Sequence, residues 1–326
     1  MKVAVIGYGR WGRVVAGKLA AMPEADLVAV VDAEFGSLAM AHELHGVATY
    51  GSTAEMLDEH EPDLCCVTVP PQHHASVALE CLAGGAHVWV TKPMAMSNVE
   101  AQAIMAGADA AERLVAVDHT LLWEPSVVTA VGMIDRGEIG QLLEVHSTRR
   151  QAGPARPEGV IWDLMPHDLA VALRLAHGPG PDMSGSTVYA DQRTYAGRVY
   201  QARLTLEIED DGPTVFLHAH ALWPTRERGM WLIGDMGALH INERGLFIHE
   251  AERTFTPGVR LDGPHIAVDT GHWDALEAQL VEVIRWTAAG DGSAEHRATG
   301  WHGLVVTDVL EAAANAAMEY ENTEAA

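Results

Sequence analysis

The sequence is poor in cysteine and in basic residues. It holds 3 cysteines in 326 residues, and Cys65 and Cys66 are neighbours in an apolar run, where their side chains would point to opposite faces of a strand. No disulfide framework is predicted, so a reducing cytoplasm is the expected location. Lys and Arg number 21 against 45 Asp and Glu, a formal net charge of −24. This charge argues against nucleic acid and anionic membrane surfaces as partners. An anionic substrate would need a local cluster of basic side chains.

Long apolar runs are absent too. No stretch reaches the length of a membrane span, and the first apolar strand is expected to begin by residue 3, which leaves no room for a signal peptide. The hydrophobic content of 48% is enough to build a full core, in one large domain or two ordinary ones.

A glycine-rich turn organises the first half of the chain. The apolar run Val3–Ile6 predicts a buried strand, and Gly7, Gly9 and Gly12 follow it at G-x-G-x-x-G spacing, before a helix expected over Trp11–Ala21. In this setting the first glycine turns the chain, the second lets a pyrophosphate approach the backbone, and the third lets helix and strand pack closely. The free N–H groups of the helix then face the phosphates.

The next strand strengthens the dinucleotide interpretation. Asp26–Val31 is apolar again and is followed by Asp32, 20 residues beyond Gly12, where a carboxylate would accept hydrogen bonds from the adenosine ribose. A carboxylate repels a 2′-phosphate, so NAD is favoured. Arg10 keeps NADP open, because a guanidinium in the glycine loop could meet that phosphate. The alternative is a glycine-turned β-α-β unit without a ligand.

Strands alternate with helices up to about residue 118, which predicts a parallel sheet covered on both faces, a Rossmann domain over residues 1–118. Ligands then lie at the carboxyl ends of the strands. That edge carries Pro70 and Pro71, the Thr91-Lys92-Pro93 turn, and Asp118 with His119. Lys92, held by the following proline, is expected beside the nicotinamide; a solvated lysine in a turn is the alternative.

The sequence pattern changes in the remainder of the chain, residues 119–326. Period-2 alternation over residues 200–209 and in later segments predicts an α+β domain with a large, mostly antiparallel, open-faced sheet. A broad face with Leu217, Leu232 and Leu246 predicts a homodimer or homotetramer. His218 and His220 share one strand face, but no further ligands accompany them, so no metal is expected.

Asp163 and His167 stand four residues apart, in a segment expected to continue as an apolar helix over Leu164–Leu175. Both side chains would then lie on one helical face, where the aspartate can orient the imidazole. A helix-capping aspartate and a packed histidine are the alternative. The candidate substrate contacts are four further residues at or beside loops expected to face the same cleft: His119, Trp123, Arg149 and Trp162. The two tryptophans could equally be core residues.

Three motifs together carry a family resemblance. The run Gly7-Tyr8-Gly9-Arg10-Trp11-Gly12, the run Thr68-Val69-Pro70-Pro71-Gln72-His73-His74 and the Lys92-Pro93 turn resemble the Gfo/Idh/MocA oxidoreductases, the glucose–fructose oxidoreductase and inositol dehydrogenase family. The run from Trp162 to Asp168 is similar to the family's Asp-x-x-x-His signature. Thr91 stands where the family has glutamate.

The resemblance implies an NAD(P)-dependent enzyme that transfers a hydride to or from a secondary alcohol or ketone of a sugar, cyclitol or sugar nucleotide. Lys92, Asp163 and His167 would form its catalytic trio, with His167 as the base. A glycosidase that uses bound NAD for a transient oxidation, which would accumulate no free NADH, and a non-catalytic NAD sensor are the alternatives. The expected cofactor contacts are Gly7, Tyr8, Gly9, Arg10, Trp11, Gly12, Asp32, Val69, Pro70, His74, Thr91 and Lys92.

Overall fold

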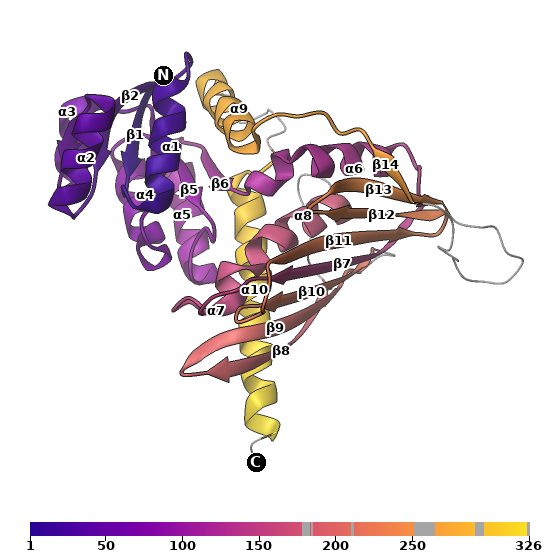
Figure 1. Ribbon diagram of the computed structural model, residues 1–326. Helices are drawn as coiled ribbons and strands as arrows, with labels where there is room; N and C mark the ends of the chain where they lie inside the picture. The colour runs from indigo at the N-terminus through magenta and orange to yellow at the C-terminus, as the bar shows by residue number, and fades with distance from the viewer. Residues whose placement is uncertain (178–182, 184, 210–211, 251–264, 291–296, 325–326) are drawn as a thin grey trace, which may run out of the picture. The chain divides into compact units, whose positions relative to one another are not determined.

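The computed structural model describes residues 1–177, 183, 185–209, 212–250, 265–290 and 297–324, and the chain divides into two compact units. Unit 1 comprises Met1–His119 and Leu276–Thr307, and unit 2 comprises Thr120–Ala275 and Asp308–Ala326. Each unit is built around one sheet, and Figure 1 shows the two sheets with their helices.

Unit 1 holds a six-stranded sheet in the order β3-β2-β1-β4-β5-β6, in which every pair of neighbours is parallel. The predicted Rossmann architecture is therefore confirmed. Strand β3 was not predicted, because three residues are too few to show a period. The strands are β1 (Lys2–Ile6), β2 (Asp26–Val31), β3 (Ala48–Tyr50), β4 (Leu64–Val67), β5 (His87–Thr91) and β6 (Val115–Asp118).

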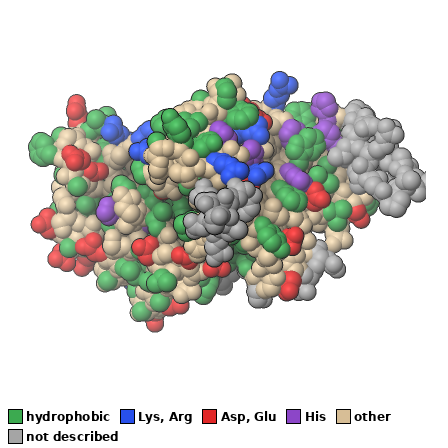
Figure 2. All heavy atoms as spheres, turned by 90° about the horizontal axis from the view of Figure 1, so that it is seen from below, with side chains coloured by type: hydrophobic (Ala, Val, Ile, Leu, Met, Phe, Trp, Pro, Cys, Tyr) green, Lys and Arg blue, Asp and Glu red, His purple; other side chains and the backbone are tan. Residues whose placement is uncertain are grey.

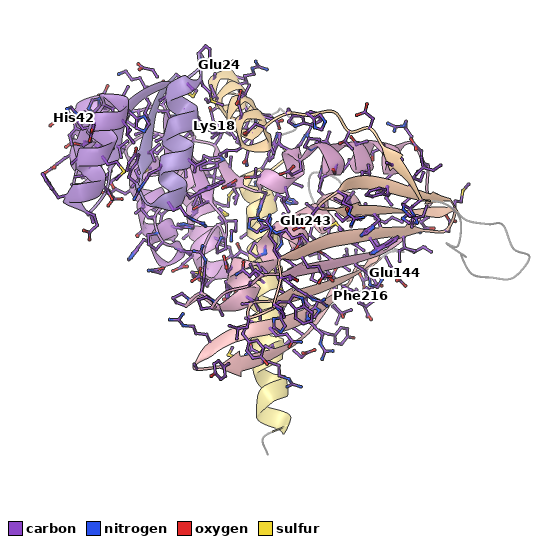
Figure 3. All side chains as sticks on the ribbon, viewed as in Figure 1. Lys18, Glu24, His42, Glu144, Phe216 and Glu243 are labelled. Atoms are coloured by element: carbon purple, nitrogen blue, oxygen red, sulfur yellow. The ribbon has the colours of Figure 1, made fainter. Side chains whose placement is uncertain are left out.

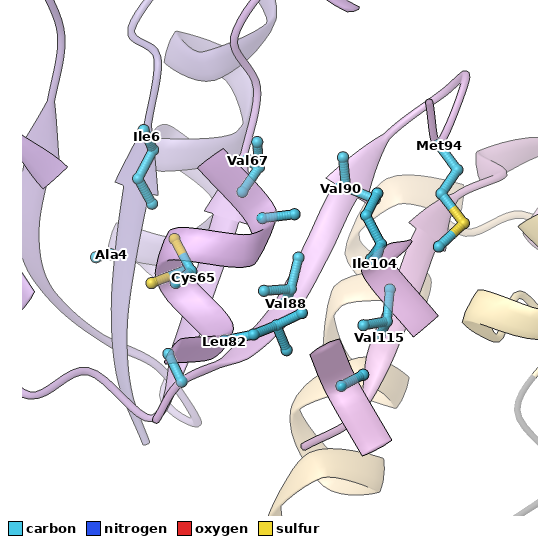
Figure 4. Close-up of a cluster of buried hydrophobic side chains, with 14 of the residues drawn as sticks. Ala4, Ile6, Cys65, Val67, Leu82, Val88, Val90, Met94, Ile104 and Val115 are labelled. Carbon is cyan, nitrogen blue, oxygen red and sulfur yellow. The ribbon is translucent and has the colours of Figure 1, made fainter. Parts of the chain in front are cut away.

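Helices cover both faces of this sheet. Residues of α3, α4 and α5 pack on one face, in the apolar cluster drawn in Figure 4, where Leu82 and Ile104 meet Val88. Two of these helices begin at a serine N-cap: the hydroxyls of Ser52 and Ser97 accept hydrogen bonds from backbone N–H groups three residues on. The helices are α1 (Arg10–Ala21), α2 (Phe35–His45), α3 (Thr53–His60), η1 (Pro71–His73), α4 (His74–Ala83) and α5 (Asn98–Ala111).

The opposite face is covered in part by a helix from the end of the chain. Leu280 and Val283 of α9 (Ala275–Ala289) are buried with Val3 and Val5 of β1. The Gln279 amide also donates to the carbonyl oxygen of Val117 at 3.0 Å. Residues 276–307 therefore belong to unit 1, which differs from the single boundary expected near residue 118. Amphipathic periodicity shows that a helix needs cover but not which sheet supplies it.

Unit 2 holds an eight-stranded sheet in the order β14-β13-β12-β11-β7-β10-β9-β8, whose neighbours are antiparallel except for β7 and β10. The predicted mostly antiparallel sheet is confirmed. Its strands are β7 (Leu142–Arg150), β8 (Thr187–Tyr195), β9 (Arg198–Glu207), β10 (Thr214–His220), β11 (Glu227–Gly234), β12 (Gly237–Asn242), β13 (Gly245–Glu250) and β14 (His265–Val268).

One face of this second sheet, the inner face, is buried. It carries Leu217, Leu232 and Leu246, each at most 3% exposed. The expectation that these leucines form an open apolar surface was wrong, because they belong to the core side of the alternation. Strands of this sheet contact α6 (Pro125–Asp135), α7 (Gly159–Asp163) and α8 (Met165–His177). The remaining helical elements are η2 (Thr120–Trp123) and α10 (Gly300–Glu324).

The other face, the outer face, carries a row of rings across five strands. Cross-strand pairing aligns them, and the row, which we term the ring ladder, is Phe247, His240, Trp231, His146 and Phe216. Trp231 stacks on His240 with ring centroids 4.0 Å apart, and His146 stacks on Phe216 at 4.5 Å. Figure 3 labels Phe216 on this sheet. All five rings are partly exposed.

The predicted helix around the Asp-x-x-x-His signature is interrupted. Asp163 ends α7, Leu164 is a turn residue, and α8 begins at Met165. The expectation of one continuous helix was wrong, whereas a shared face for the two side chains stays a prediction. Pro166 supplies the physical reason, because it lacks the N–H that would bond to the carbonyl of Trp162.

None of the helices in the described ranges is both long and apolar enough to cross a membrane.

Candidate functional site

The glycine loop of unit 1 is shaped by close backbone packing. Gly7 has φ +94°, and a Cβ there would lie 2.8 Å from the backbone of Thr68 and Val69. A Cβ on Gly12 would overlap the carbonyl oxygen of Gly7, whereas a Cβ on Gly9 would have no heavy atom within 4 Å. Two glycines are therefore required by the protein itself, and Gly9 leaves open space in front of the loop.

Thr68 holds this loop in place, a role that sequence reasoning missed. Its hydroxyl lies 2.6 Å from the carbonyl oxygen of Gly7 and 3.2 Å from that of Ile6. The position directly after β4, beside the glycine turn of β1, was the available signal, since parallel neighbours end at one edge. The N-cap position of α1, Gly9, has no side-chain cap, so the first N–H groups of this helix have no side chain in front of them.

Asp32 lies beside the glycine loop, as predicted for a ribose-binding carboxylate. Its Oδ2 accepts a hydrogen bond from the backbone N–H of Tyr8 at 2.5 Å, and its Oδ1 accepts one from that of Glu34 at 2.8 Å. These two bonds fix the carboxylate at the carboxyl end of β2. The Tyr8 side chain is buried, with its hydroxyl 2.8 Å from Nε2 of His45, so only its backbone can face a ligand.

Trp11 and Arg10 begin α1 and are both exposed. The indole N–H of Trp11 donates to Oδ2 of Asp118 at 2.8 Å, which ties the start of the helix to the end of β6. Asp118 itself is buried. This bond gives Trp11 a structural role next to the glycine loop.

The Lys92 turn is tied to the proline segment by His74. The His74 ring is buried, with Nδ1 2.7 Å from the carbonyl oxygen of Pro93 and Nε2 2.9 Å from that of Val69. The hydroxyl of Thr91 lies 3.1 Å from the same Nε2 and donates to the carbonyl oxygen of Val67 at 3.3 Å. Thr91, where the family has glutamate, therefore helps to fix the turn that carries Lys92. Burial lowers the pKa of His74, against the two backbone hydrogen bonds.

His119 is enclosed within unit 1, with 1% of its surface exposed. Neither ring nitrogen has a hydrogen-bond partner in the described structure, and the ring packs edge-on against His302 with centroids 5.5 Å apart. Burial, followed by the charges of His302 and Lys92, holds the pKa of His119 well below its usual value. The imidazole is therefore neutral at pH 7. Its predicted contact with substrate stays a prediction.

The predicted acid–base residues lie in unit 2, apart in sequence from Lys92 in unit 1. Oδ2 of Asp163 lies 3.4 Å from Nε of Arg156, and the Asp163 side chain is 12% exposed. His167 lies in the first turn of α8 and is half-buried. Their assembly with Lys92 around one substrate stays a prediction.

The candidate substrate contacts differ in their surroundings. Arg149 is buried and forms a bidentate ion pair with Asp168, Nε to Oδ2 at 2.7 Å and Nη2 to Oδ1 at 2.6 Å. Trp123 is buried too, and its carbonyl oxygen accepts the indole N–H of Trp273 at 2.7 Å. These environments favour structural roles for Arg149 and Trp123, whereas Trp162 is half-buried.

Sequence reasoning also missed Arg228, which shares the inner face of β11 with Met230 and Leu232. An arginine at a core-side position of an alternating strand was the available signal.

Acidic side chains are spread over the molecular face in Figure 2, while basic and histidine side chains gather beside hydrophobic ones. Among the described residues, no group of three or more His, Cys, Asp or Glu side chains could hold a metal ion.

The residues of unit 1 fit a dinucleotide. An open Gly9, an uncapped helix N-terminus and a carboxylate fixed at the end of β2 are the groups that a pyrophosphate and an adenosine ribose require. The carboxyl edge of the sheet also carries the Lys92 turn.

Comparison with known proteins agrees with this fit. Residues 1–119 match the model of the oxidoreductase family with an NAD-binding Rossmann fold. The chain is 26% identical over 324 residues to inositol 2-dehydrogenase 2 of Saccharopolyspora erythraea, covering 96% of this chain and 91% of the relative. It is 27% identical over 329 residues to the UDP-N-acetylglucosamine 3-dehydrogenase of Acidithiobacillus ferrooxidans, covering 96% and 95%.

A solved structure from Magnetospirillum magnetotacticum superposes with a TM-score of 0.79 at 26% identity, covering 96% of this chain and 99% of that one. The fold of both units is thus similar to that of this solved structure, and the glycine loop with Asp32 fits the cofactor that the family model names. Residues 1–119 are therefore similar to the NAD-binding Rossmann domain of the Gfo/Idh/MocA oxidoreductase family, and the whole chain is similar to the relatives named above.

Proposed function

We propose that this protein is an NAD-dependent dehydrogenase or reductase that acts on a secondary alcohol or ketone of a sugar, cyclitol or sugar nucleotide. The observation that carries the proposal is the carboxyl edge of the unit 1 sheet. There the open glycine loop, the Asp32 carboxylate and the fixed Lys92 turn follow parallel strands of one sheet. Asp32 favours NAD, because its negative charge would repel the 2′-phosphate of NADP.

The relatives support this substrate class. The S. erythraea protein is named for inositol, and the A. ferrooxidans protein for a sugar nucleotide. A further relative from Comamonas testosteroni, 27% identical over 217 residues, is named for a carboxylated dihydroxy ring. Each name describes oxidation of a ring hydroxyl.

In the proposed mechanism His167 accepts the proton of the substrate hydroxyl as the carbon becomes a carbonyl. Lys92 donates a hydrogen bond to the same oxygen and stabilises its developing negative charge. Asp163 orients the imidazole and stabilises its protonated form. When bound, NAD would supply the acceptor for the hydride that leaves the same substrate carbon. In the direction of reduction His167 returns the proton to the oxygen.

Single-turnover kinetics test these roles. We expect His167→Asn and Lys92→Ala each to slow the hydride step roughly a hundredfold or more while NAD still binds. His42→Asn, a change of an exposed histidine on α2, is the matched control and should leave the step unchanged. A hydride step that survives the substitution of His167 would refute the proposal. A screen of polyols, amino sugars and nucleotide sugars identifies the substrate.

We also propose that two or more copies associate through the outer face of the second sheet. The ring ladder gives this face a continuous aromatic strip across five strands, flanked by polar side chains such as Thr148 and Arg203. Light scattering at micromolar concentration should report a dimer or tetramer. Trp231→Glu should shift it towards monomer, whereas Arg203→Glu, on the same face but outside the ladder, should do so less.

A further inference from the structure

Two arginines face each other on the inner face of the second sheet. Arg149 of β7 pairs directly with Arg228 of β11 in the antiparallel register. Both occupy core-side positions: Arg149 lies on the same face of β7 as buried Val145, and Arg228 on the same face of β11 as buried Leu232. Like charges directly opposite in an antiparallel pair destabilise a sheet, so this placement requires compensating negative charge.

One of the two arginines is compensated within the protein. The Asp168 carboxylate binds Arg149 through two hydrogen bonds of 2.6 and 2.7 Å, and both side chains are at most 10% exposed. Burial alone would lower the pKa of Arg149, but the charge and hydrogen bonds of Asp168 raise it. The charges of Arg149 and Asp168 therefore neutralise each other, and Arg149 has few N–H donors left for a ligand.

The other arginine is not compensated. Arg228 is half-buried, and within the described part of the chain its guanidinium makes no hydrogen bond and no ion pair. Burial, then the charges of Arg149 and Arg226, lower its pKa to about 10, against the opposing effect of Asp168. It remains a cation at neutral pH. A guanidinium carries five N–H donors, and holding them partly away from water without acceptors costs free energy.

The carboxyl group of Glu124 does not supply the negative charge that would pair with Arg228. Burial and then the charge of Asp274 raise the pKa of Glu124, and the charge of Arg228 opposes the shift. The charge of Arg228 thus acts on Glu124, yet in the described ranges the two side chains form no ion pair. Arg228 is half-buried, whereas Glu124 is exposed.

We propose that Arg228 binds an oxyanion carried by the substrate, either a carboxylate or a phosphate, and thereby makes the enzyme selective for an acidic or phosphorylated sugar or cyclitol. A planar guanidinium fork matches both groups through paired hydrogen bonds. Arg149, held by its ion pair with Asp168, lies directly opposite Arg228 on the adjacent strand β7. The inference rests on the proposed function, because Asp168 directly follows His167, the proposed base.

The overall charge of the chain bears on how an anion could bind. A chain with a formal net charge of −24 repels anions at long range, so an anionic substrate needs a local positive group to bind. Arg228 of β11 and Arg226, which directly precedes this strand, are two cations close together in the chain. Arg226 is occupied at the surface, with Nε 3.4 Å from Oε1 of Glu243, which Figure 3 labels.

Calorimetric titration of the NAD-loaded protein tests the site without relying on turnover. The probes are D-glucose, D-glucuronate and glucose 6-phosphate at matched ionic strength, so that the two anionic sugars distinguish carboxylate from phosphate. We expect at least one anionic sugar to bind about tenfold or more tightly than glucose, the gain of a charge-assisted hydrogen bond. Arg228→Met should abolish this preference, and Arg228→Lys should retain part of it.

Arg226→Met is the matched control. It removes an arginine two residues away whose side chain is 63% exposed, and it should leave the preference intact. Thermal unfolding provides a second readout, because Arg228→Met removes a cation that faces Arg149. The variant should unfold at an equal or higher temperature than the parent. A clear drop would mean that Arg228 serves a structural pair, and would overturn the proposal.

Equal binding of neutral and anionic sugars, or no binding of either anionic sugar, would also overturn it. Failure of the proposed function gives a different result. If anionic sugars bind preferentially but no substrate reduces NAD, the anion site stands and the dehydrogenase does not. If neutral polyols are oxidised and Arg228→Met changes nothing, the dehydrogenase stands and the anion site does not.

Discussion

The candidate sites of the two units are built by different physical means. In unit 1 the glycine loop depends on the absence of side chains, because Gly7 and Gly12 pack backbone against backbone and Gly9 leaves open space. In unit 2 the inner face of the sheet depends on charged side chains, because Arg149 and Arg228 face each other across two strands. A site built from backbone geometry suits a cofactor that many enzymes share. A site built from side-chain charge can change with each substrate.

The largest effect on stability is expected from the loss of the buried Arg149–Asp168 ion pair of unit 2. Asp168→Ala should leave Arg149 buried without its partner and destabilise the protein by about 3–5 kcal/mol. Asp191→Ala removes one partner of the Arg203–Asp191 pair, whose arginine is 61% exposed, and should cost at most about 1 kcal/mol. Urea unfolding of both variants measures the difference. Equal losses would mean that burial does not set the value of the Arg149–Asp168 pair.

The glycine loop offers a matched pair of substitutions of the same size. Gly12→Ala places a Cβ against the carbonyl oxygen of Gly7 and should destabilise the fold by about 1–3 kcal/mol. Gly9→Ala meets no heavy atom within 4 Å, so it should leave the melting temperature unchanged and weaken NAD binding. Thermal unfolding with and without NAD separates the two effects. A destabilised Gly9 variant with normal NAD affinity would contradict this division of roles.

Asp32 sharpens the comparison, because in unit 1 it is a charged side chain that acts beside a backbone site. Asp32→Asn removes the charge and keeps an acceptor oxygen for only one of the two N–H groups, those of Tyr8 and Glu34, that the carboxylate binds. We expect the ratio of NAD to NADP affinity to fall about tenfold, since the repulsion of the 2′-phosphate is lost. Fluorescence titration with both cofactors measures it. An unchanged ratio would assign cofactor choice to another residue, with Arg10 as the next to substitute.

The same contrast explains what the sequence reveals. The Rossmann sheet, the glycine loop and Asp32 were predictable, because each follows from residues close together in the chain. The second sheet was predictable from its alternation, but its faces were not. Period-2 patterning marks two faces without saying which one a helix covers, so Leu217 and its neighbours were assigned to the open side.

Pairing between distant strands was not predictable either. The Arg149–Arg228 register and the Arg149–Asp168 ion pair join segments that no local pattern connects. The break in the helix between Asp163 and His167 had a local signal in Pro166, which should have ended the expected helix. The catalytic roles of these residues stay predictions, because they follow from the family resemblance and from the chemistry of hydride transfer.

The smallest expected effect is a pH-dependent contribution of His119 to the stability of unit 1. The pKa of His119 lies well below its usual value in the folded state, so the unfolded chain binds a proton that the folded chain rejects. Its contribution to stability is complete above pH 6.5, the ordinary histidine value, and is lost as the pH falls below it, by up to about 1.4 kcal/mol per pH unit. Urea unfolding between pH 5.5 and pH 7.5, a range set roughly around that value, should show this slope. His119→Leu should flatten it by up to one proton, whereas His272→Leu, at an exposed site, should not. An unchanged slope in the His119 variant would mean that water reaches this ring, and that the backbone site of unit 1 lies next to an open histidine.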